Sequence, residues 1–240
     1  MRRPNGLIIA IDGVVGSGKT ATARLVAEKL GYRHLDTGAM YRAVTLAATR
    51  SKVAATDTEE LASLLATVEI SLPLRAAEGR LPHVGGESPR SGDRVLLNGE
   101  DVSEAIRRPE VTRQIGAYAD LPLVRRALVA QQQQMGAEGG VVAEGRDTGT
   151  VVFPDAELKV RMVAALTERA RRRHRELIAK GVSLSFDEVL ADVGKRDIED
   201  AQRDYGVAGI PADSVEVDTT DMTLEQQVDH IVDLARQRGA

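Results

Sequence analysis

The sequence predicts an α/β protein whose parallel central sheet has about five strands, with helices on both faces. Short apolar runs at 7–11 and 140–144 are typical of strands buried on both faces. Between such runs, apolar residues recur at helical spacing, first over 20–30, and Gly31 follows as a stop signal. A strand, a glycine-rich turn and a helix therefore open the chain, and this order begins a βαβ unit.

The remaining elements of the core follow the same two patterns. Further strands are predicted at 32–36, 158–163 and 214–218. Helices are predicted around 41–47 and over 109–135, 167–180, 186–202 and 224–238. The helices at 167–180 and 186–202 are rich in charge, and Gly181 between them predicts a helical hairpin.

The character of the chain changes over about 68–105. Short β-like pieces at 68–74 and 95–98 are separated by Gly, Pro and Ser, which predicts a small β-rich insertion. Residues 76–93 lack a sustained apolar period, and we expect a mobile loop there. The sequence therefore predicts one domain with an insertion.

Composition excludes several classes of protein. The 240 residues carry 32 Lys and Arg against 36 Asp and Glu, so a net charge of −4 gives no general attraction to nucleic acid or anionic membranes. Only 2% of the residues are aromatic, which disfavours base-stacking platforms. The absence of Cys excludes disulfides and thiolate chemistry, and the apolar run at 7–11 is too short for a signal peptide. We therefore expect a cytoplasmic protein.

The turn after the first strand fits the phosphate-binding pattern G-x-x-x-x-G-K-[ST]. Its residues are Gly13, Val14, Val15, Gly16, Ser17, Gly18, Lys19 and Thr20, and we include the next helical residue, Ala21, in the predicted ATP site. Backbone N–H groups and a helix N-terminus would surround the phosphates, Lys19 would reach the β- and γ-oxygens, and the Thr20 hydroxyl would bind Mg²⁺. A glycine-rich turn that binds nothing is the alternative, which the placement between a strand and a helix disfavours. The motif alone names no reaction.

Three further segments carry a specific resemblance. They are Asp36-Thr37-Gly38-Ala39-Met40-Tyr41-Arg42, the run from Glu144 to Ala156 (EGRDTGTVVFPDA), and the run from Lys195 to Arg203 (KRDIEDAQR). Together with the phosphate loop, they make the chain similar to bacterial cytidylate kinases over nearly its whole length. Gly116 stands where several members of that family carry Ser or Thr, and Glu144 replaces the usual Asp.

The resemblance implies a P-loop kinase fold that phosphorylates CMP and dCMP with ATP and Mg²⁺. It implies a core of 1–67, 106–166 and 204–240, a monophosphate-binding insertion near 68–105 and a helical lid near 167–203. It also implies that CMP is bound by Thr37, Arg42, Arg125, Arg146, Asp147, Arg196, Asp200 and Arg203. Small-molecule substrates and a monomeric enzyme are expected.

These residue types suit a nucleotide acceptor, although each has a simpler explanation. An Arg fork can bind two phosphate oxygens at once, but an isolated Arg is more often a surface ion pair. Asp147 can accept from a base amino group. Asp200 and Arg203 share a helix face, which fits either one ligand or an ordinary i,i+3 ion pair.

The arginine run of the predicted lid has three interpretations. Residues 169–175 could form a nucleic-acid patch, a solvated helix face or a surface that closes over ATP. The position in the chain favours the last, and we expect Arg169 and Arg173, with Arg172 as a further candidate, to contact the transferring phosphoryl group. Lys19, Arg146, Arg169 and Arg173 are thus the predicted catalytic residues.

Three rival functions would each account for part of the sequence. A P-loop kinase of another acceptor, such as adenylate or a sugar acid, would not match all three acceptor segments. A non-catalytic nucleotide-binding regulator would have no use for the acceptor arginines. An arginine-rich nucleic-acid-binding protein would need a basic balance or aromatic platforms.

Overall fold

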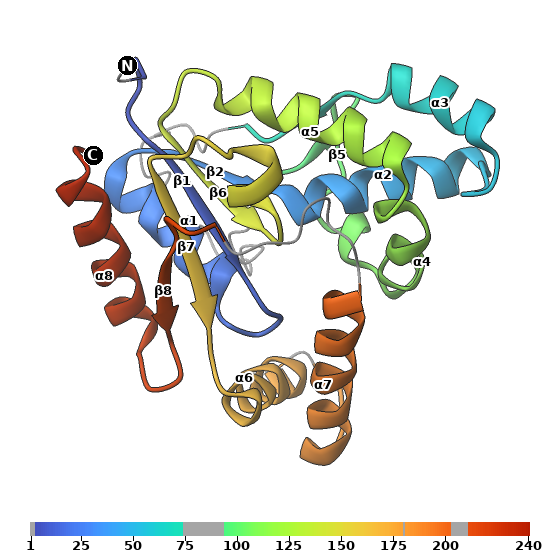
Figure 1. The fold of residues 1–240 in the computed structure, drawn as a ribbon. Coiled ribbons are helices and arrows are strands. Elements are labelled where there is room, and N and C mark those ends of the chain that lie inside the picture. Colours follow the sequence, from blue (N-terminus) through green and yellow to red (C-terminus); the bar gives the residue numbers. More distant parts are fainter. Residues whose placement is uncertain (1–2, 74–93, 180, 203–210) are drawn as a thin grey trace, which may run out of the picture. The chain divides into compact units, whose positions relative to one another are not determined.

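The structure is a computed structural model of the 240-residue chain, and it describes residues 3–73, 94–179, 181–202 and 211–240 (Figure 1). The loop expected at 76–93 and the predicted site residue Arg203 lie outside these ranges. The chain divides into two compact units, one formed by Met1–Leu35 with Gln132–Ala240 and the other by Asp36–Gln131.

A five-stranded sheet organises the first unit, in the order β2-β6-β1-β7-β8. Its strands are β1 (Ile8–Gly13), β2 (Arg33–Asp36), β6 (Val141–Gly145), β7 (Leu158–Val163) and β8 (Val215–Asp218). β1 pairs in parallel with β6 on one side and β7 on the other, and β7 pairs in parallel with β8. The predicted parallel sheet of five strands is confirmed.

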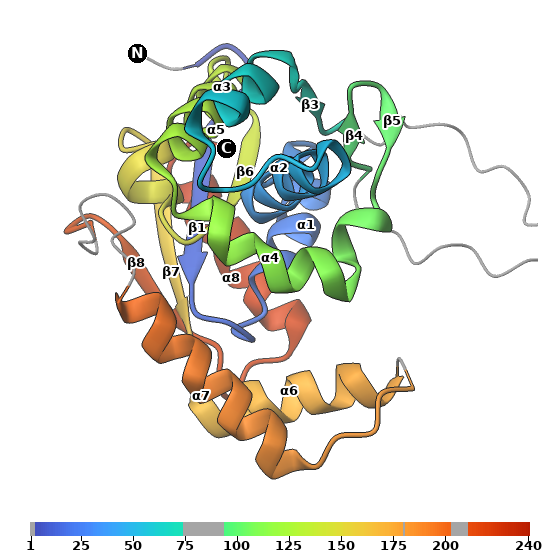
Figure 2. The same ribbon diagram turned by 90° about the vertical axis from the view of Figure 1, so that its right-hand side faces the viewer.

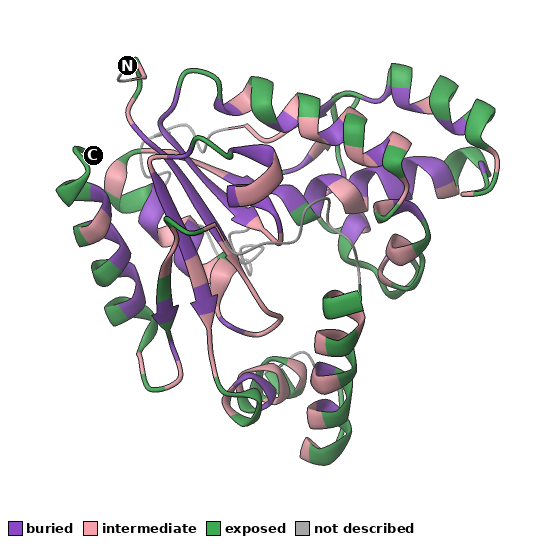
Figure 3. Cartoon of the chain, in the orientation of Figure 1, coloured by how far each residue is buried: buried purple, intermediate pink, exposed green. Residues whose placement is uncertain are grey.

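The main core lies between this sheet and two helices, α1 (Lys19–Leu30) and α8 (Leu224–Gln237), which pack together (Figure 1). Ile9 and Ile11 of β1 are fully buried against Val26 of α1 and Ile231 of α8. Figure 3 shows α8 buried on its inner face and exposed on its outer face. Successive residues of β1, from Ile8 to Ile11, are all buried, so this strand is an apolar run rather than an alternating pattern.

A helical hairpin, α6 (Leu166–Ala179) and α7 (Phe186–Gln202), follows β7. The two helices contact each other and lie beyond the carboxyl ends of the strands (Figures 1 and 2). Between β6 and β7, residues Thr148–Val152 form one turn of π-helix, η2. π-Helical turns are rare and frequently mark functional sites.

The second unit contains α2 (Thr37–Ser51), α3 (Thr58–Thr67), α4 (Pro109–Ala119), a short 3₁₀ turn η1 (Ala105–Arg107) and most of α5 (Pro122–Gly136). A small antiparallel sheet joins β3 (Ile70–Ser71), β4 (Leu96–Leu97) and β5 (Glu100–Asp101). The helical pattern predicted over 109–135 is two helices, because Pro122 begins the second one. Proline disfavours helical backbone in the residue before it, and here that residue is Leu121.

Candidate functional site

The phosphate-binding motif occupies the turn between β1 and α1, at the carboxyl edge of the sheet. Two of its glycines are required by their surroundings. A Cβ on Gly13 would lie 2.1 Å from the carbonyl oxygen of Met162, and a Cβ on Gly16, whose φ is +77°, would lie 3.0 Å from Cβ of Arg169. Only glycine allows β7 and α6 to approach the loop so closely. The backbone N–H groups of the first turn of α1 therefore lie at the carboxyl edge of the sheet.

Lys19, the first residue of α1, folds back over the loop. Its Nζ donates to the carbonyl oxygen of Val14 at 2.9 Å. Burial lowers the pKa of Lys19 from 10.5 to about 8, and the positive charge of Arg146 adds to the lowering. The carboxylates of Glu144, Asp12 and Asp200 act in the opposite direction. A phosphate group bound here would raise this pKa, because its negative charge stabilises the charged ammonium group.

Arg146 comes directly after β6 and reaches the same loop. Its Nη1 donates to the carbonyl oxygen of Gly13 at 3.0 Å and lies 2.8 Å from Oδ2 of Asp200 on α7. A cavity of about 260 Å³ opens here, and Gly13, Val14, Arg146 and Asp200 are among its lining residues. The structure therefore brings two predicted CMP-binding residues together with the start of the predicted ATP loop.

Asp12, the residue before the loop, was not singled out from the sequence. Its Oδ1 accepts from the backbone N–H of Thr148 at 2.8 Å and from the Thr148 hydroxyl at 2.6 Å, and its Oδ2 accepts from the N–H of Gly149 at 2.8 Å. These bonds tie the end of β1 to the turn that follows Arg146. The contact joins positions 136 residues apart, so no local pattern signals it.

The arginines of α6 have different surroundings. Arg169 is 5% exposed, and its Nη1 donates to the carbonyl oxygen of Val15 at 3.1 Å. Its Nη1 and Nη2 also bind both carboxylate oxygens of Asp197 on α7, at 2.8 and 2.6 Å. Arg173 instead pairs with Glu176 one turn along α6, at 2.8 Å. Of the two predicted lid arginines, Arg169 therefore touches the phosphate loop, and Arg173 forms a pair within its own helix.

Arg172 also reaches the loop, and it does so together with a residue that the sequence did not single out. Its Nη1 lies 3.3 Å from the carbonyl oxygen of Ser17 and 3.1 Å from Oγ1 of Thr219, in the loop after β8. Thr219 is fully buried.

Asp147 and Arg196 are two other predicted CMP-binding residues of the first unit. Asp147 follows Arg146 directly, and Arg196 lies on α7. Asp147 is 5% exposed and precedes η2. Arg196 on α7 is half-buried, and its Nε lies 3.3 Å from Oδ2 of Asp192.

The predicted acceptor residues of the second unit are positioned by α2 and α5. Thr37 begins α2 and is buried, next to the helix cap formed by Asp36. Nη1 of Arg42 donates to Oγ1 of Thr112 on α4 at 2.8 Å, and Arg125 lies half-buried on α5. Gly116 lies within α4.

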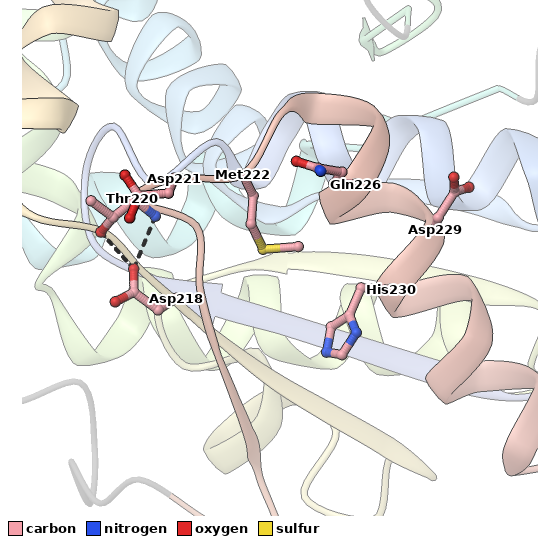
Figure 4. A pocket seen from close by; sticks show the side chains of 7 residues that line it. All are labelled: Asp218, Thr220, Asp221, Met222, Gln226, Asp229 and His230. Atoms are coloured by element: carbon pink, nitrogen blue, oxygen red, sulfur yellow. Dashed lines mark hydrogen bonds between the residues drawn. The ribbon is translucent and has the colours of Figure 1, made fainter.

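A second, open groove follows the loop after β8 along α8 (Figure 4). Asp218, Asp221, Met222 and His230 are among the residues that line it. Oδ1 of Asp218 accepts from the N–H and the hydroxyl of Thr220, and these bonds lower the pKa of Asp218 below its usual value. The same loop carries Thr219, which binds the phosphate loop.

The donor set suits a hard cation that takes most of its ligands from phosphate. Thr20, exposed at the start of α1, offers a hydroxyl oxygen, which is a ligand type that Mg²⁺ accepts. Among residues 3–73, 94–179, 181–202 and 211–240, no group of three or more acidic or His side chains is arranged to hold a metal.

A parallel sheet whose first strand runs into a glycine-rich loop, with a Lys at the start of the next helix and arginines around it, defines the class of P-loop nucleotide-binding proteins. The comparisons place the chain within that class. A family model for cytidylate kinase matches residues 9–237. The chain belongs to the cytidylate kinase family.

Similar proteins support this membership. The chain is 41% identical to a cytidylate kinase of Geobacter sulfurreducens over 97% of this chain and 94% of that protein. It is 39% identical to a cytidylate kinase of Bacillus subtilis over 97% of this chain and 98% of that protein. It is also 44% identical to a bifunctional pantoate ligase/cytidylate kinase of Synechococcus elongatus, over 99% of this chain and 43% of that protein. In the described part of the chain, no helix is both long and apolar enough to span a membrane.

Proposed function

We propose that this protein transfers the γ-phosphoryl group of ATP to the phosphate of CMP or dCMP, producing ADP and CDP or dCDP. The observation that carries the proposal is the position of Arg146. Its guanidinium group binds the carbonyl oxygen of Gly13 in the phosphate loop and pairs with Asp200 beside one cavity. Donor-binding and acceptor-binding groups would thus meet at one point, as phosphoryl transfer requires.

On the donor side, the loop from Gly13 to Thr20 would bind the phosphates of ATP through its N–H groups, with Ala21 completing the site. Lys19 would exchange its bond to Val14 for the β- and γ-oxygens. Mg²⁺, held through Thr20 and the phosphates, would supply positive charge that offsets the charge of the reacting oxygens.

On the acceptor side, Arg146 and Arg42 would bind the monophosphate through their planar forks. Asp147 and Arg125 would contact the base, and Asp200 and Arg196 would contact the sugar. Thr37 and Arg203 would complete the CMP site. Residues near 68–105 would form the monophosphate-binding insertion, and residues near 167–203 would form the lid. The enzyme would act as a monomer.

The transfer itself needs no covalent intermediate. An oxygen of the CMP phosphate attacks the γ-phosphorus while the bond from that phosphorus to the β,γ-bridging oxygen breaks, and ADP leaves. The acceptor phosphate is ionised near neutral pH, because its second pKa is about 6, so no strong general base is required. Lys19, Arg146, Arg169 and Arg173 would stabilise the charge spread over the transferring group.

The test is a coupled ADP-release assay with ATP and Mg²⁺ against CMP, dCMP, UMP, AMP and GMP. Fast turnover is expected with CMP and dCMP. Arg146→Ala should lower kcat/KM for CMP by about a hundredfold, because a bidentate charge-assisted contact is lost. Arg175→Ala removes the same charge from an exposed site whose partner is Glu168, and it should change turnover less than about twofold. Equal turnover with every acceptor, or none with any, would overturn the proposal.

A further inference from the structure

Two side chains contact the carbonyl oxygen of Ser17 in the phosphate loop. Oγ1 of Thr219 lies 3.0 Å from it, and Nη1 of Arg172 lies 3.3 Å from it. Arg172 comes from α6, and Thr219 comes from the loop between β8 and α8. Two segments distant in the chain therefore meet at one peptide group of the loop.

The donors available at this point fit a three-membered hydrogen-bond network. Nη1 of Arg172 has two hydrogens, one for the carbonyl of Ser17 and one for Oγ1 of Thr219, which lies 3.1 Å away. Thr219 has one hydroxyl hydrogen, and either Ser17 or Val163 can accept it, since the Val163 oxygen lies 3.1 Å from Oγ1. The backbone N–H of Thr219 already donates to the Val163 oxygen at 2.8 Å. The Ser17 oxygen, at 3.0 Å, is the nearer acceptor for the hydroxyl hydrogen.

The direction of this carbonyl fixes the direction of the next N–H group. A trans peptide unit is planar, and its C=O and N–H bonds point in opposite directions. All described peptide bonds are trans. When the Ser17 oxygen points toward Arg172 and Thr219, the N–H of Gly18 must point to the opposite side of the loop. Arg169 acts in the same way one turn earlier on α6, because it binds the carbonyl of Val15 at 3.1 Å and so orients the N–H of Gly16.

We propose that Arg172 and Thr219 are positioning residues of the phosphate loop, and that they orient the Gly18 N–H group toward the bound phosphates. Neither side chain needs to touch the nucleotide. The cationic guanidinium also polarises the peptide unit, which strengthens the N–H as a donor to an anion. This inference rests on the proposed function only in that the loop binds a nucleotide phosphate.

The network also satisfies the buried hydroxyl group of Thr219. A fully buried hydroxyl must find partners, because an unsatisfied one costs free energy. Here its partners are the phosphate loop and the arginine that binds the same carbonyl. Thr219→Val keeps the shape of the side chain and removes both bonds, so it isolates the effect of the hydroxyl.

The test is calorimetric titration of ADP and, separately, of CMP into Thr219→Val, Arg172→Gln and the double variant. ADP makes the loop contacts without turnover. Each single variant is expected to raise the Kd of ADP about tenfold, the size expected for a lost hydrogen bond to a charged partner, and to change the Kd of CMP less than about twofold. The double variant should be little weaker than the worse single variant, because both side chains act on one carbonyl.

Matched controls separate positioning from charge and from folding. Arg171→Gln removes the same charge from the same helix at an exposed position, and it should leave the Kd of ADP unchanged. Thr219→Ser retains the hydroxyl and should bind ADP like the wild type. Unchanged ADP binding in a folded Arg172→Gln protein, equal weakening by Arg171→Gln, or fully additive losses would each overturn the proposal. If the wild type binds ADP but never phosphorylates CMP, the proposed function fails while the loop assignment is still decided by these titrations.

Discussion

At the scale of single residues, Lys19 should make the affinity for ATP depend on pH. Its ammonium group is buried at the start of α1 and has a pKa of about 8 without nucleotide. A polyphosphate binds the charged form, so binding raises this pKa and takes up protons near pH 8. The affinity for ATP should therefore be constant below pH 8 and should fall above it.

Calorimetry of ATP binding between pH 7 and 9.5 checks this. The Kd should rise by up to about tenfold per pH unit above pH 8, which is the limit for one linked proton. Lys19→Arg stays charged over the whole range and should remove this pH dependence, even if its affinity is lower. A wild-type Kd that does not change between pH 7 and 9.5 would contradict the assignment.

Asp12 is a residue whose importance comes entirely from the fold. It accepts three hydrogen bonds from Thr148 and Gly149. In Asp12→Asn, one carboxylate oxygen becomes an NH₂ group that faces N–H donors. We expect a loss of about 2 kcal/mol of stability, seen as a melting temperature lower by about 4–8 °C.

The matched control for Asp12 is Asp233→Asn. The side chain of Asp233 is 67% exposed, with a contact to Arg236 at 3.9 Å. The free energy of unfolding of this variant, measured by calorimetry, should differ from that of the wild type by less than about 0.5 kcal/mol. Equal melting temperatures for the two variants would show that the bonds of Asp12 contribute nothing.

At the scale of elements, α8 begins with a capping box next to the loop that carries Thr219. Oγ1 of Thr223 accepts from the N–H of Gln226, whose side chain accepts from the N–H of Thr223. Thr223→Ala should cost about 1 kcal/mol and lower the melting temperature by about 2–4 °C. Because the cap does not touch the phosphate loop, kcat/KM should stay within about twofold of the wild type.

Thermal melting with a parallel activity assay measures both effects. Thr58→Ala changes an exposed Thr on α3 and serves as the control, with an expected change below about 0.5 kcal/mol. A loss of activity in Thr223→Ala without loss of stability would contradict this separation of cap and site.

The elements also show what the sequence can and cannot predict. Strands β1, β6 and β7 are local apolar runs, and the predictions for them are confirmed. Helix α3 was missed, although Asp57 caps it three residues before Glu60 and its buried residues Leu61 and Leu65 have helical spacing. The break before Pro122 was also available from the sequence, since a proline so often ends or begins a helix.

At the scale of the whole molecule, the sequence predicts a parallel sheet but not the order of its strands. β6, more than a hundred residues after β1, lies directly beside it. The site depends on this neighbourhood, because it brings Arg146 to the loop at Gly13. A local pattern predicts the phosphate loop, while Asp12 and Thr219 become visible only through contacts between distant segments.

In the proposed reaction, a phosphoryl group moves from ATP to CMP. Phosphorus NMR of one mixture of protein, ATP, Mg²⁺ and CMP tests it most directly, because CDP, ADP and inorganic phosphate give separate signals. We expect CDP and ADP to appear in equal amounts and inorganic phosphate not to accumulate. ADP accompanied by inorganic phosphate without CDP would show that the protein hydrolyses ATP and does not transfer the phosphoryl group to CMP.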